Sequence, residues 1–416
     1  MQVTGVLMGK ISPARTVAFE VLRDVAAGAY ASDALRDRSR TLDARDAGLA
    51  SQIVFGCLRF QAQLDYLIHV YSRRKIDDLD APVVLALRMA IYQLRYLERI
   101  PAHAAVHESV ELVKQHKRAA TGFVNAVLRK VNRKAVSWPD EATELSCPEW
   151  LLARWRAHFG ADAARGIAKA ALVEPAAYIR VRSGDDPPEG VFAERTSDLA
   201  ERSGDFAERT QVIAERTQIE GAWRLLAPLP AGMRLHDIGS QAILPLLDLR
   251  AGQTYLDLCS APGNKTLQAL ETPLSLAVAC DVSERRLRDV PPVCPRVVLD
   301  ATRELPFSRP FDRIFIDAPC SGTGTLARNP EIKWRVREQD FARFREKQLQ
   351  IIAQGLKLLA PGGKLLYATC SLEEEENEEV IRGTLAREPG LRVEREMWRL
   401  PGREEGDGFY AAVLTR

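Results

Sequence analysis

Apolar residues recur at helical spacing from residue 12 to about residue 135. The segment SPARTVAFEVLRDV is typical, because a serine in the N-cap position and a proline after it precede the apolar stripe. Later segments repeat the pattern with short breaks between them: RDAGLASQIVFGCLRFQAQLDYLI, APVVLALRMAIYQLRYL, AAVHESVELVKQH and TGFVNAVLRKVNRK. The pattern predicts a compact helical bundle.

The middle of the chain mixes two periods. CPEWLLARWRAHFGADAARGIAKAAL has the helical period, whereas AAYIRVRS alternates as a strand does. From Phe192 to Ile219 the heptapeptides FAERTSD, LAERSGD, FAERTQV and IAERTQI follow one another. A short coiled-coil seam is one interpretation, but Gly204 interrupts the narrow apolar line. We favour a tandem duplication that forms a solvated insertion without a catalytic role.

From about residue 233 the pattern changes to alternating strands, turns and helices. QTYLDLCSAPGNKTLQAL indicates a strand, a glycine turn and a helix, and further strands are indicated by SLAVACD, PRVVLDA, FDRIFIDAPC and GGKLLYATC. GDGFYAAVLTR is typical of a closing antiparallel strand. Such alternation favours a doubly wound, mainly parallel α/β sheet. The predicted fold class is therefore multidomain: an all-α bundle, a small α+β linking domain and a Rossmann-like α/β domain.

Polar residues of the α/β part stand where the predicted strands end. The turn 259–265 contains Gly263 and Asn264, which both tolerate a positive φ and let a ligand approach the backbone. The next three strands each end in an acid: Asp281, Asp300 and Asp317. Ligands of such sheets bind beyond the carboxyl ends of the strands. Since the turn is neither a G-x-G-x-x-G nor a P-loop sequence, the pattern favours an adenosyl ligand without a polyphosphate.

Composition and charge narrow the function further. The net charge of the 416 residues is only +2, so a nucleic-acid partner must be held by local basic patches. No run approaches the roughly 20 apolar residues that span a bilayer, and the first residues lack a signal-peptide pattern. We therefore expect a cytoplasmic protein without membrane contact. Seven cysteines without a CxxC pair or a Cys/His ligand pattern predict free thiols and no metal site.

Two of the cysteines, Cys320 and Cys370, follow predicted strand ends. If these strands are neighbours, as the usual winding requires, both thiols emerge on one rim beside the ligand. A single free thiol is often only a buried filler, but two thiols after Ala-Pro and Ala-Thr turns favour chemistry. C5 of cytosine is a poor nucleophile, and addition of a thiolate to C6 enables it to attack a methyl sulfonium. A second thiol or a nearby base then helps to remove the C5 proton and release the enzyme.

Three motifs carry a family resemblance. LDLCSAPGNKT, DAPCSGTGTLARNPEIKWR and YATCSLEEEENEEVI resemble the RNA cytosine-5 methyltransferases of the Sun/Nop class, as do LHDIGSQAILPLL and GDGFYAAVL. The N-terminal helices resemble the NusB-like RNA-binding domain, and the fusion is similar to the RsmB (Sun/Fmu) family, which methylates cytosine in 16S rRNA. The resemblance covers almost the whole chain apart from the repeats. It implies a NusB-like domain at 1–145, a linking domain at 146–232 and a methyltransferase domain at 233–416.

The resemblance implies a role for each residue of the site. Cys370 is implied as the nucleophile, Cys320 as the group that assists product release, and Asp317 as a contact of the cytosine near N3 and of the methyl end of S-adenosylmethionine. Asp281 is implied on the ribose and Asp300 near the adenine. The turn is implied to hold the rest of the cofactor, through Cys259, Ser260, Ala261, Pro262, Gly263, Asn264 and Lys265. Lys265 is also expected to steady Asp317, rather than to be a solvated lysine at a helix start.

The segment RNPEIKWR, residues 328–335, is implied by the same resemblance to line the RNA groove. Arg328, Lys333 and Arg335 are expected to meet phosphates. Trp334 is expected either to pack structurally or to stack on a base.

Two departures from the family pattern affect the cofactor pocket. The family turn usually carries two glycines, and here Asn264 stands in place of the second. The gap from Asp281 to Asp300 is 19 positions (300 − 281), which leaves little room for a full crossover helix. The adenine side of the pocket is therefore expected to differ most from the family pattern, whereas Asp317 and the two thiols are untouched.

The favoured function is methylation of cytosine C5 in 16S rRNA by a monomeric enzyme that uses S-adenosylmethionine. The same chemistry on tRNA is a close alternative. A non-catalytic RNA-binding ribosome-assembly factor with a vestigial pocket is an alternative of another class. A third is a DNA cytosine methyltransferase, in which the attacking thiol would be in the position of Cys320.

Overall fold

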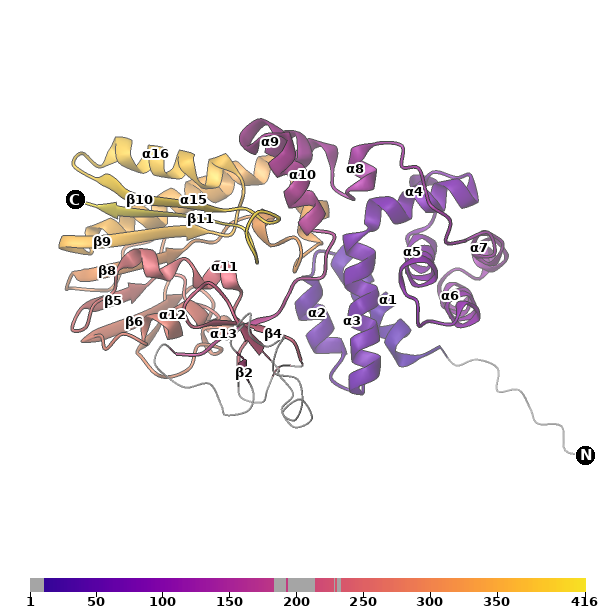
Figure 1. Cartoon of the computed structure of the whole chain (residues 1–416), viewed down its shortest axis with the longest axis horizontal. Helices are drawn as coiled ribbons and strands as arrows, with labels where there is room; N and C mark the ends of the chain where they lie inside the picture. The colour runs from indigo at the N-terminus through magenta and orange to yellow at the C-terminus, as the bar shows by residue number, and fades with distance from the viewer. Residues whose placement is uncertain (1–10, 183–191, 194–213, 228, 230–232) are drawn as a thin grey trace, which may run out of the picture. The chain divides into compact units, whose positions relative to one another are not determined.

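The computed structural model describes residues 11–182, 192–193, 214–227, 229 and 233–416. The chain divides into two compact units (Figure 1). The first comprises the described residues of Met1–Val173 together with Leu326–Arg335, and the second comprises those of Glu174–Thr325 and Val336–Arg416. The helical unit thus includes a short segment that follows the predicted Cys320 turn in sequence. The predicted three-part division, with boundaries at 145 and 232, stays a prediction.

Helices build the first unit, as the spacing of apolar residues predicts. Their bounds are α1 (Pro13–Ala26), α2 (Ala31–Arg38), α3 (Ala44–Arg59), α4 (Gln61–Ser72), α5 (Ala81–Tyr96), α6 (Ala102–His116), α7 (Thr121–Leu128), α8 (Glu141–Glu144), α9 (Glu149–Phe159), α10 (Ala161–Ala170) and, from the later segment, α14 (Ile332–Arg335). The apolar faces of α1–α7 form one core, in which the largest fully buried side chains include Phe19, Ile53 and Leu64. The first helix begins at Pro13, after Ser12, as predicted. The Ser12 hydroxyl donates to Glu108 of α6 instead of capping its own helix.

A small sheet opens the second unit, in the order β1–β4–β3–β2. Its strands are β1 (Tyr178–Arg180), β2 (Phe192–Ala193), β3 (Ala214–Arg216) and β4 (Ala222–Leu225). Most of the heptapeptide repeats, and with them the predicted solvated insertion, lie outside the described residues. The two ends of the repeat region that are described pair with each other as the parallel strands β2 and β3.

A larger sheet dominates the second unit, with the order β10–β11–β9–β8–β5–β6–β7 among the described residues (Figure 1). The strands are β5 (Thr254–Asp257), β6 (Leu276–Asp281), β7 (Arg296–Val298), β8 (Phe311–Asp317), β9 (Leu359–Thr369), β10 (Arg392–Arg399) and β11 (Phe409–Thr415). From β9 to β7 neighbouring strands are parallel, and β11 is antiparallel to β9, as predicted. The order reverses between β5 and β8, so this sheet has its switch point there. The predicted fold class is confirmed.

Alternation along the strands gives the sheet two buried faces. Leu256, Ile314 and Tyr367 belong to one apolar cluster, which the long helix α15 (Glu338–Lys357) and α16 (Glu378–Arg387) cover. Their neighbours in sequence, among them Phe315, belong to a second cluster with the turn Leu244–Leu247. The remaining helices of the unit are α11 (Ile238–Gln241), α12 (Asn264–Ala269) and α13 (Glu284–Leu287). Because α13 is so short, the connection from β6 to β7 is as abbreviated as the sequence predicts.

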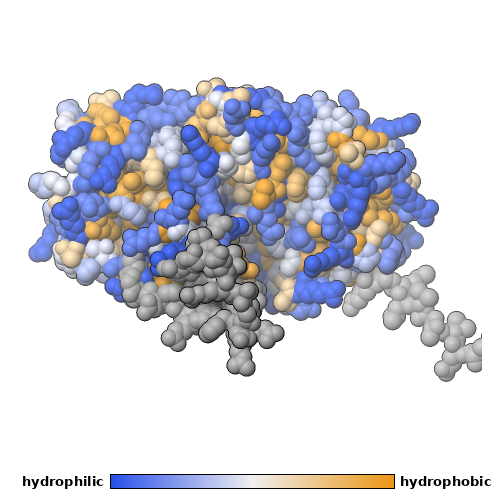
Figure 2. All heavy atoms as spheres, in the orientation of Figure 1, coloured by the Kyte–Doolittle hydropathy of each residue, from blue (hydrophilic) through white to orange (hydrophobic). Residues whose placement is uncertain are grey.

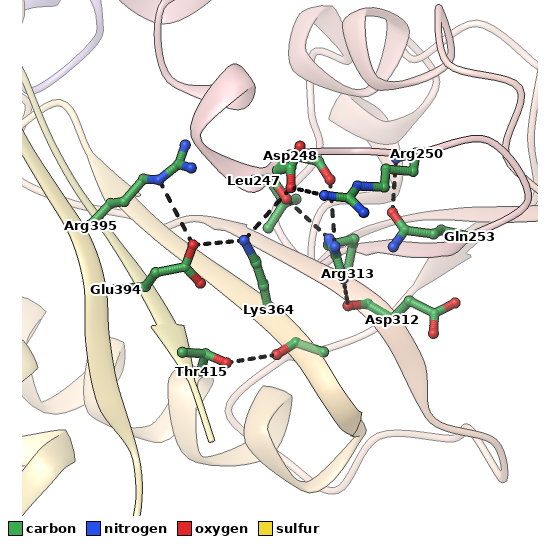
Figure 3. Close-up of polar contacts among 11 residues, drawn as sticks. Leu247, Asp248, Arg250, Gln253, Asp312, Arg313, Lys364, Glu394, Arg395 and Thr415 are labelled. Carbon is green, nitrogen blue, oxygen red and sulfur yellow. Dashed lines mark hydrogen bonds and ion pairs between the residues drawn. The ribbon is translucent and has the colours of Figure 1, made fainter.

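A network of charges stands near the amino end of β8 (Figure 3). Arg313 of β8 is buried, and its Nε donates to the carbonyl of Leu247 at 3.0 Å. Opposite it in the ladder, Lys364 of β9 pairs with Glu394 of β10 at 2.7 Å and lies 3.8 Å from the carboxylate of Asp248. The network joins the two central strands to Leu247 and Asp248 and to the edge strand β10. We call this end of β8 and β9 the anchored end.

Hydrophilic residues cover much of the face shown in Figure 2, with hydrophobic residues in small groups among them. In the part of the chain that the structure describes, every helix is too short or too polar to cross a bilayer.

Candidate active site

The turn after β5 gives the site its first wall. Gly263 has a φ of 100° and caps α12, and a Cβ atom there would lie 3.1 Å from Val290. Glycine is therefore required at this position for its backbone conformation and for the close approach. Asn264 does not use its tolerance of the left-handed region, because it is the first residue of α12. Its side chain instead bonds to Leu235 and Arg234, which ties the turn to the chain before β5.

Asp281 ends β6 beside this turn. One of its carboxylate oxygens accepts from the backbone N–H of Ala261 at 3.2 Å and the other from that of Ser283 at 2.9 Å. Asp300 follows β7 and accepts from the hydroxyl and the backbone N–H of Thr302, and these bonds lower the pKa of its carboxyl. Both carboxylates are thus held by local hydrogen bonds and keep lone pairs for a ligand.

Asp317 ends β8 and forms an ion pair with Lys265 of α12. The Lys265 Nζ lies 2.6 Å from the Asp317 Oδ2, and the lysine side chain is 11% exposed. Burial alone would lower the pKa of the Lys265 ammonium, but the charge of Asp317 and the hydrogen bond to it raise the pKa above its usual value. The lysine therefore stays charged, and it fixes the Asp317 carboxylate, as expected from the sequence.

The two thiols of the predicted site meet. β8 and β9 are neighbours in register, with Asp317 opposite Ala368, and the turns after them carry Cys320 and Cys370. The two Sγ atoms are 3.4 Å apart, and both side chains are partly exposed. The hydrogen bond to Cys370 and burial raise the pKa of the Cys320 thiol well above its usual value. Cys320 therefore keeps its proton at neutral pH.

These elements surround a cavity of about 240 Å³. Seven of the predicted site residues line it: Cys259, Ala261, Asp281, Asp300, Asp317, Cys320 and Cys370. Ser260, Pro262, Gly263, Asn264 and Lys265 do not line it, and they shape the turn or hold Asp317 from behind. Sequence reasoning missed several lining residues, namely Val282, Arg286, Leu299, Ala301, Lys347 and Ile351.

The missed residues stand on elements whose pattern gave only weak signals. Lys347 and Ile351 are four positions apart on α15, a spacing that places them on one helix face. Leu299 follows β7 and precedes the predicted Asp300. The cavity thus combines carboxylates with an apolar wall. This donor set suits an adenosyl group with its ribose, so the residues present fit S-adenosylmethionine.

Two buried acids near the site also escaped the sequence analysis. Burial raises the pKa of Asp257, at the end of β5, to about 7, although Thr266 donates a hydrogen bond to it. Burial likewise raises the pKa of Glu376 to about 7. Glu376 lies in the turn Glu374–Glu376 after the Cys370 strand, within a run of glutamates. Nothing in that run marks one glutamate as buried, except that Glu373 and Glu376 are three positions apart.

The prediction for the segment RNPEIKWR needs a correction, because Lys333 and Trp334 are bonded to residues of the helical unit. Lys333 is 1% exposed, and its Nζ donates to the carbonyl of Arg59 at 2.9 Å. The predicted phosphate contact of Lys333 is wrong for this arrangement, because its ammonium has no access to solvent. The Trp334 Nε1 donates to the carbonyl of Leu58 at 2.7 Å, which gives the indole a structural role. Base stacking by Trp334 and phosphate contacts of Arg328 and Arg335 stay predictions.

Among the described residues, no group of three His, Cys, Asp or Glu side chains is arranged to hold a metal ion.

Comparison with known families identifies both units. Residues 244–415 match the model of the 16S rRNA methyltransferase RsmB/F family, and residues 12–133 match the NusB family. The probable ribosomal RNA small subunit methyltransferase B of Bacillus subtilis is 31% identical over 394 residues, which cover 86% of this chain and 85% of that protein. The ribosomal RNA small subunit methyltransferase B of Klebsiella pneumoniae strain 342 is 31% identical over 94% of each chain.

Solved structures share the fold. The crystal structure of the protein PH0851 has a TM-score of 0.76 at 22% identity and covers 98% of this chain and 100% of its own. A methyltransferase homologue from Pyrococcus horikoshii has a TM-score of 0.52 at 22% identity, over 67% of this chain and 99% of its own. With the sequence matches, these likenesses lead to one conclusion: the chain belongs to the RsmB/F family of 16S rRNA methyltransferases.

Proposed function

We propose that this S-adenosylmethionine-dependent rRNA methyltransferase methylates C5 of a cytosine in 16S rRNA through a covalent bond between Cys370 and C6. The single observation that carries the proposal is the pair of thiols, which lie 3.4 Å apart and both line the cavity. One thiol would suffice for a structural role, whereas this reaction uses two sulfur atoms in turn.

The proton on Cys320 supports Cys370 as the attacking thiol. We assign the S–H of Cys320 as the donor of this hydrogen bond and the Cys370 sulfur as its acceptor, because the bond and burial raise the pKa of Cys320. The thiolate is the nucleophilic form of a cysteine, and Cys320 keeps its proton, so we assign the attack to Cys370. The Cys370 thiolate adds to C6, the electrons move to C5, and C5 takes the methyl group that S-adenosylmethionine supplies when bound.

We propose that the same hydrogen bond determines when the second step can occur. Its acceptor is the largest cause of the raised pKa of Cys320. Once the Cys370 sulfur is bonded to C6, it is an uncharged thioether and only a weak acceptor for the Cys320 S–H. Cys320 then releases its proton to solvent, takes the proton from the methylated C5, and the C6–S bond breaks to restore the C5=C6 double bond and the Cys370 thiolate.

We assign Asp317 the role of orienting the base. Its carboxylate lines the same cavity as the two thiols and is fixed by Lys265 from behind. We assign it the edge of the cytosine around N3, where the exocyclic amine offers a donor. Asp281 and Asp300 line the part of the cavity that we assign to the ribose and adenine of the cofactor.

The target cytosine must leave its stack to reach Cys370. A single-stranded or loosely paired segment is the favoured substrate, because extrusion from a duplex costs a few kcal/mol. The NusB-family helices are proposed to supply affinity for the surrounding RNA, and binding through phosphates makes that affinity depend on salt.

Covalent trapping tests the proposal. 16S rRNA containing 5-fluorocytosine cannot lose a proton from C5, so we expect a stable adduct between the RNA and the peptide that contains Cys370, detected by mass spectrometry. Bisulfite mapping of rRNA and tRNA from a deletion strain locates the modified base. A modification confined to tRNA would redirect the proposal to tRNA, and wild-type protein that methylates no RNA would favour the assembly-factor alternative.

A further inference from the structure

Each of the two thiols is followed in sequence by a serine, and the two serines converge on one carboxylate. The Ser371 hydroxyl donates to Glu376 Oε1 at 2.6 Å, and the Ser321 hydroxyl donates to the same oxygen. The backbone N–H of Ser321 donates to the other oxygen, Oε2, at 2.8 Å. The two hydroxyl oxygens are 3.0 Å from each other. Glu376 is therefore bonded to both turns that carry a reactive sulfur.

The surroundings hold Glu376 itself in place. It is fully buried, and its Oε2 accepts a further hydrogen bond from Gln348 of α15 at 3.2 Å. Gln348 also donates to the carbonyl of Pro319, next to Cys320. The Tyr367 hydroxyl donates to the Glu376 carbonyl at 2.6 Å. Glu376 is thus held by Gln348 of α15 and by Tyr367 of β9. A glutamate that is fixed in this way can set the positions of the two turns.

Direct bonds between the two turns complete the arrangement. The backbone N–H of Gly324 donates to the carbonyl of Cys370 at 2.8 Å, and that of Leu372 donates to the Thr323 hydroxyl at 2.9 Å. Asn377, next to Glu376, donates to the carbonyl of Ser371. Each of these bonds reaches at most one of the two serines, whereas among the described contacts the Glu376 carboxylate bonds to both Ser321 and Ser371.

We propose that Glu376 is a positioning residue that holds the Cys320 and Cys370 sulfur atoms at the spacing the two thiol steps require. The kinetic part of this inference rests on the proposed covalent mechanism. The geometric part does not, because it concerns only the distance between two sulfur atoms. Glu376 does not line the cofactor cavity, so its loss is expected to leave cofactor binding unchanged.

The hydrogen bonds predict which substitute can replace the glutamate. A glutamine with its oxygen in the place of Oε2 still accepts from the Ser321 N–H and from Gln348, and its NH₂ group donates to the two serine hydroxyls, which rotate to accept. The negative charge is not needed, in line with the pKa of Glu376, which burial raises to about 7. Alanine provides none of these bonds.

Kinetics with three variants test the role. We expect Glu376→Ala to lower kcat by on the order of 10²-fold, since a displacement of about 1 Å has such an effect on an aligned reaction. The KM for RNA and the Kd for S-adenosylmethionine are expected to change less than about twofold, and Glu376→Gln is expected to recover most of kcat. The matched control is Glu374→Ala, because the carboxylate of Glu374, in the same turn, pairs with Arg382 at the surface and with no thiol turn among the described residues.

A second measurement needs no methyl acceptor. Diamide, an azo oxidant, takes two electrons and two protons from a pair of thiols to give a disulfide and is itself reduced to the hydrazine. We expect wild type and Glu376→Gln to form the Cys320–Cys370 disulfide at similar rates, and Glu376→Ala to form it at least about fivefold more slowly. Peptide mass spectrometry identifies the cross-link.

The outcomes separate this inference from the proposed function. A normal cross-linking rate in Glu376→Ala would overturn the positioning role, whatever the substrate proves to be. A Glu376→Gln variant as inactive as the alanine variant would overturn it too, because the charge would then take part in the reaction. Slow cross-linking in Glu376→Ala, with a wild type that forms no adduct on Cys370, would keep the positioning role and reject the covalent mechanism.

Discussion

The two ends of the neighbouring strands β8 and β9 carry polar groups in opposite conditions. At the anchored end, Arg313 and Lys364 are matched with carbonyls and carboxylates, and the pKa of Glu394 is lowered, chiefly by its hydrogen bond to Lys364. At the other end, which we call the reactive end, burial raises the pKa of Glu376 and leaves it near 7. The same two strands thus carry a network of paired charges at one end. At the other end they carry groups whose pKa values are raised, that of Cys320 by its hydrogen bond to Cys370 and by burial and that of Glu376 by burial.

This difference indicates that residues important for stability and residues important for activity lie at opposite ends of the two strands. Charges at the anchored end are paired or bonded, so their loss should reduce the free energy of unfolding and leave the chemistry intact. Groups at the reactive end are buried next to like charges or beside thiols, an arrangement that favours proton transfer near neutral pH. Substitutions at the anchored end should therefore mainly lower the free energy of unfolding, and substitutions at the reactive end should mainly lower kcat.

The largest effect is expected at Cys370. Cys370→Ala should lower methyl transfer to 16S rRNA by on the order of 10⁴-fold or more, because it removes the attacking atom. Binding of S-adenosylmethionine, measured by calorimetry, should be retained. Residual transfer within tenfold of wild type would exclude Cys370 as the nucleophile.

Cys320→Ala should give the second largest effect and a different product. Turnover should fall by on the order of 10²-fold or more, since the proton on C5 loses its acceptor. A covalent complex with unmodified RNA should accumulate and migrate slowly on a denaturing gel. If the complex formed in Cys370→Ala and not in Cys320→Ala, the roles of the two thiols would be reversed.

Lys265 tests the support of Asp317. Lys265→Met should lower kcat by on the order of tenfold, because the Asp317 carboxylate loses the partner that fixes it 2.6 Å away. Single-turnover kinetics would locate the effect in the chemical step. An unchanged rate would show that the carboxylate is oriented by other contacts.

Arg313 tests the anchored end. Arg313→Met should lower the free energy of unfolding by about 1–3 kcal/mol, since buried carbonyls lose a charged donor. Urea unfolding monitored by circular dichroism measures this change, and kcat should stay within about twofold of wild type. A large loss of kcat in a stable variant would contradict the separation between the two ends.

The smallest effect concerns pH. The pKa of Glu376 is about 7 in the folded protein, whereas that of an ordinary glutamate is 4.5, so its contribution to stability is complete below about pH 4.5 and is lost as pH rises through about 7. Asp312, near the anchored end, has the opposite sign: bonds from Thr254 lower its pKa, and its contribution is lost only as pH falls below 3.8 and through that lowered value.

The variant Glu376→Gln isolates the first of these contributions. Between pH 5 and pH 8 its free energy of unfolding should fall less than that of wild type, because the glutamine cannot titrate. Urea unfolding at each pH measures both curves. Parallel curves for the two proteins would show that Glu376 does not titrate in this range.

Much of the fold and site follows from local patterns in the sequence. Apolar strands that alternate with turns and helices, and the acids at the strand ends, sufficed to predict the sheet, the cavity and the meeting of Cys320 with Cys370. These features depend on periodicity and on the rule that parallel strands end at one edge. Helical spacing likewise sufficed for the first unit.

What the sequence did not reveal depends on partners far away along the chain. RNPEIKWR looks like a solvated basic segment, and only its contacts with Leu58 and Arg59 make Lys333 a buried group. Glu376 is one of several adjacent glutamates, and its contacts with Ser321 of another turn and with Gln348 of α15 distinguish it from the others. Arg286 of α13 lines the cavity and donates to the carbonyl of Ala261 in another turn, a contact that its own neighbours in sequence do not indicate.

The segment Leu326–Arg335 has a consequence for the order in which the protein matures on the ribosome. The helical unit begins at the N-terminus, yet it includes residues that are synthesised only after β5, β6, β7 and β8. Glu331, Lys333 and Trp334 are therefore synthesised only after much of the other unit. Until then, their partners in the helical unit lack these hydrogen bonds: the backbone N–H of Ala31 and the carbonyls of Leu58 and Arg59. A nascent chain stopped before residue 326 has all of α1–α10 but not the residues that complete their packing, so the part made first is among the last to be finished.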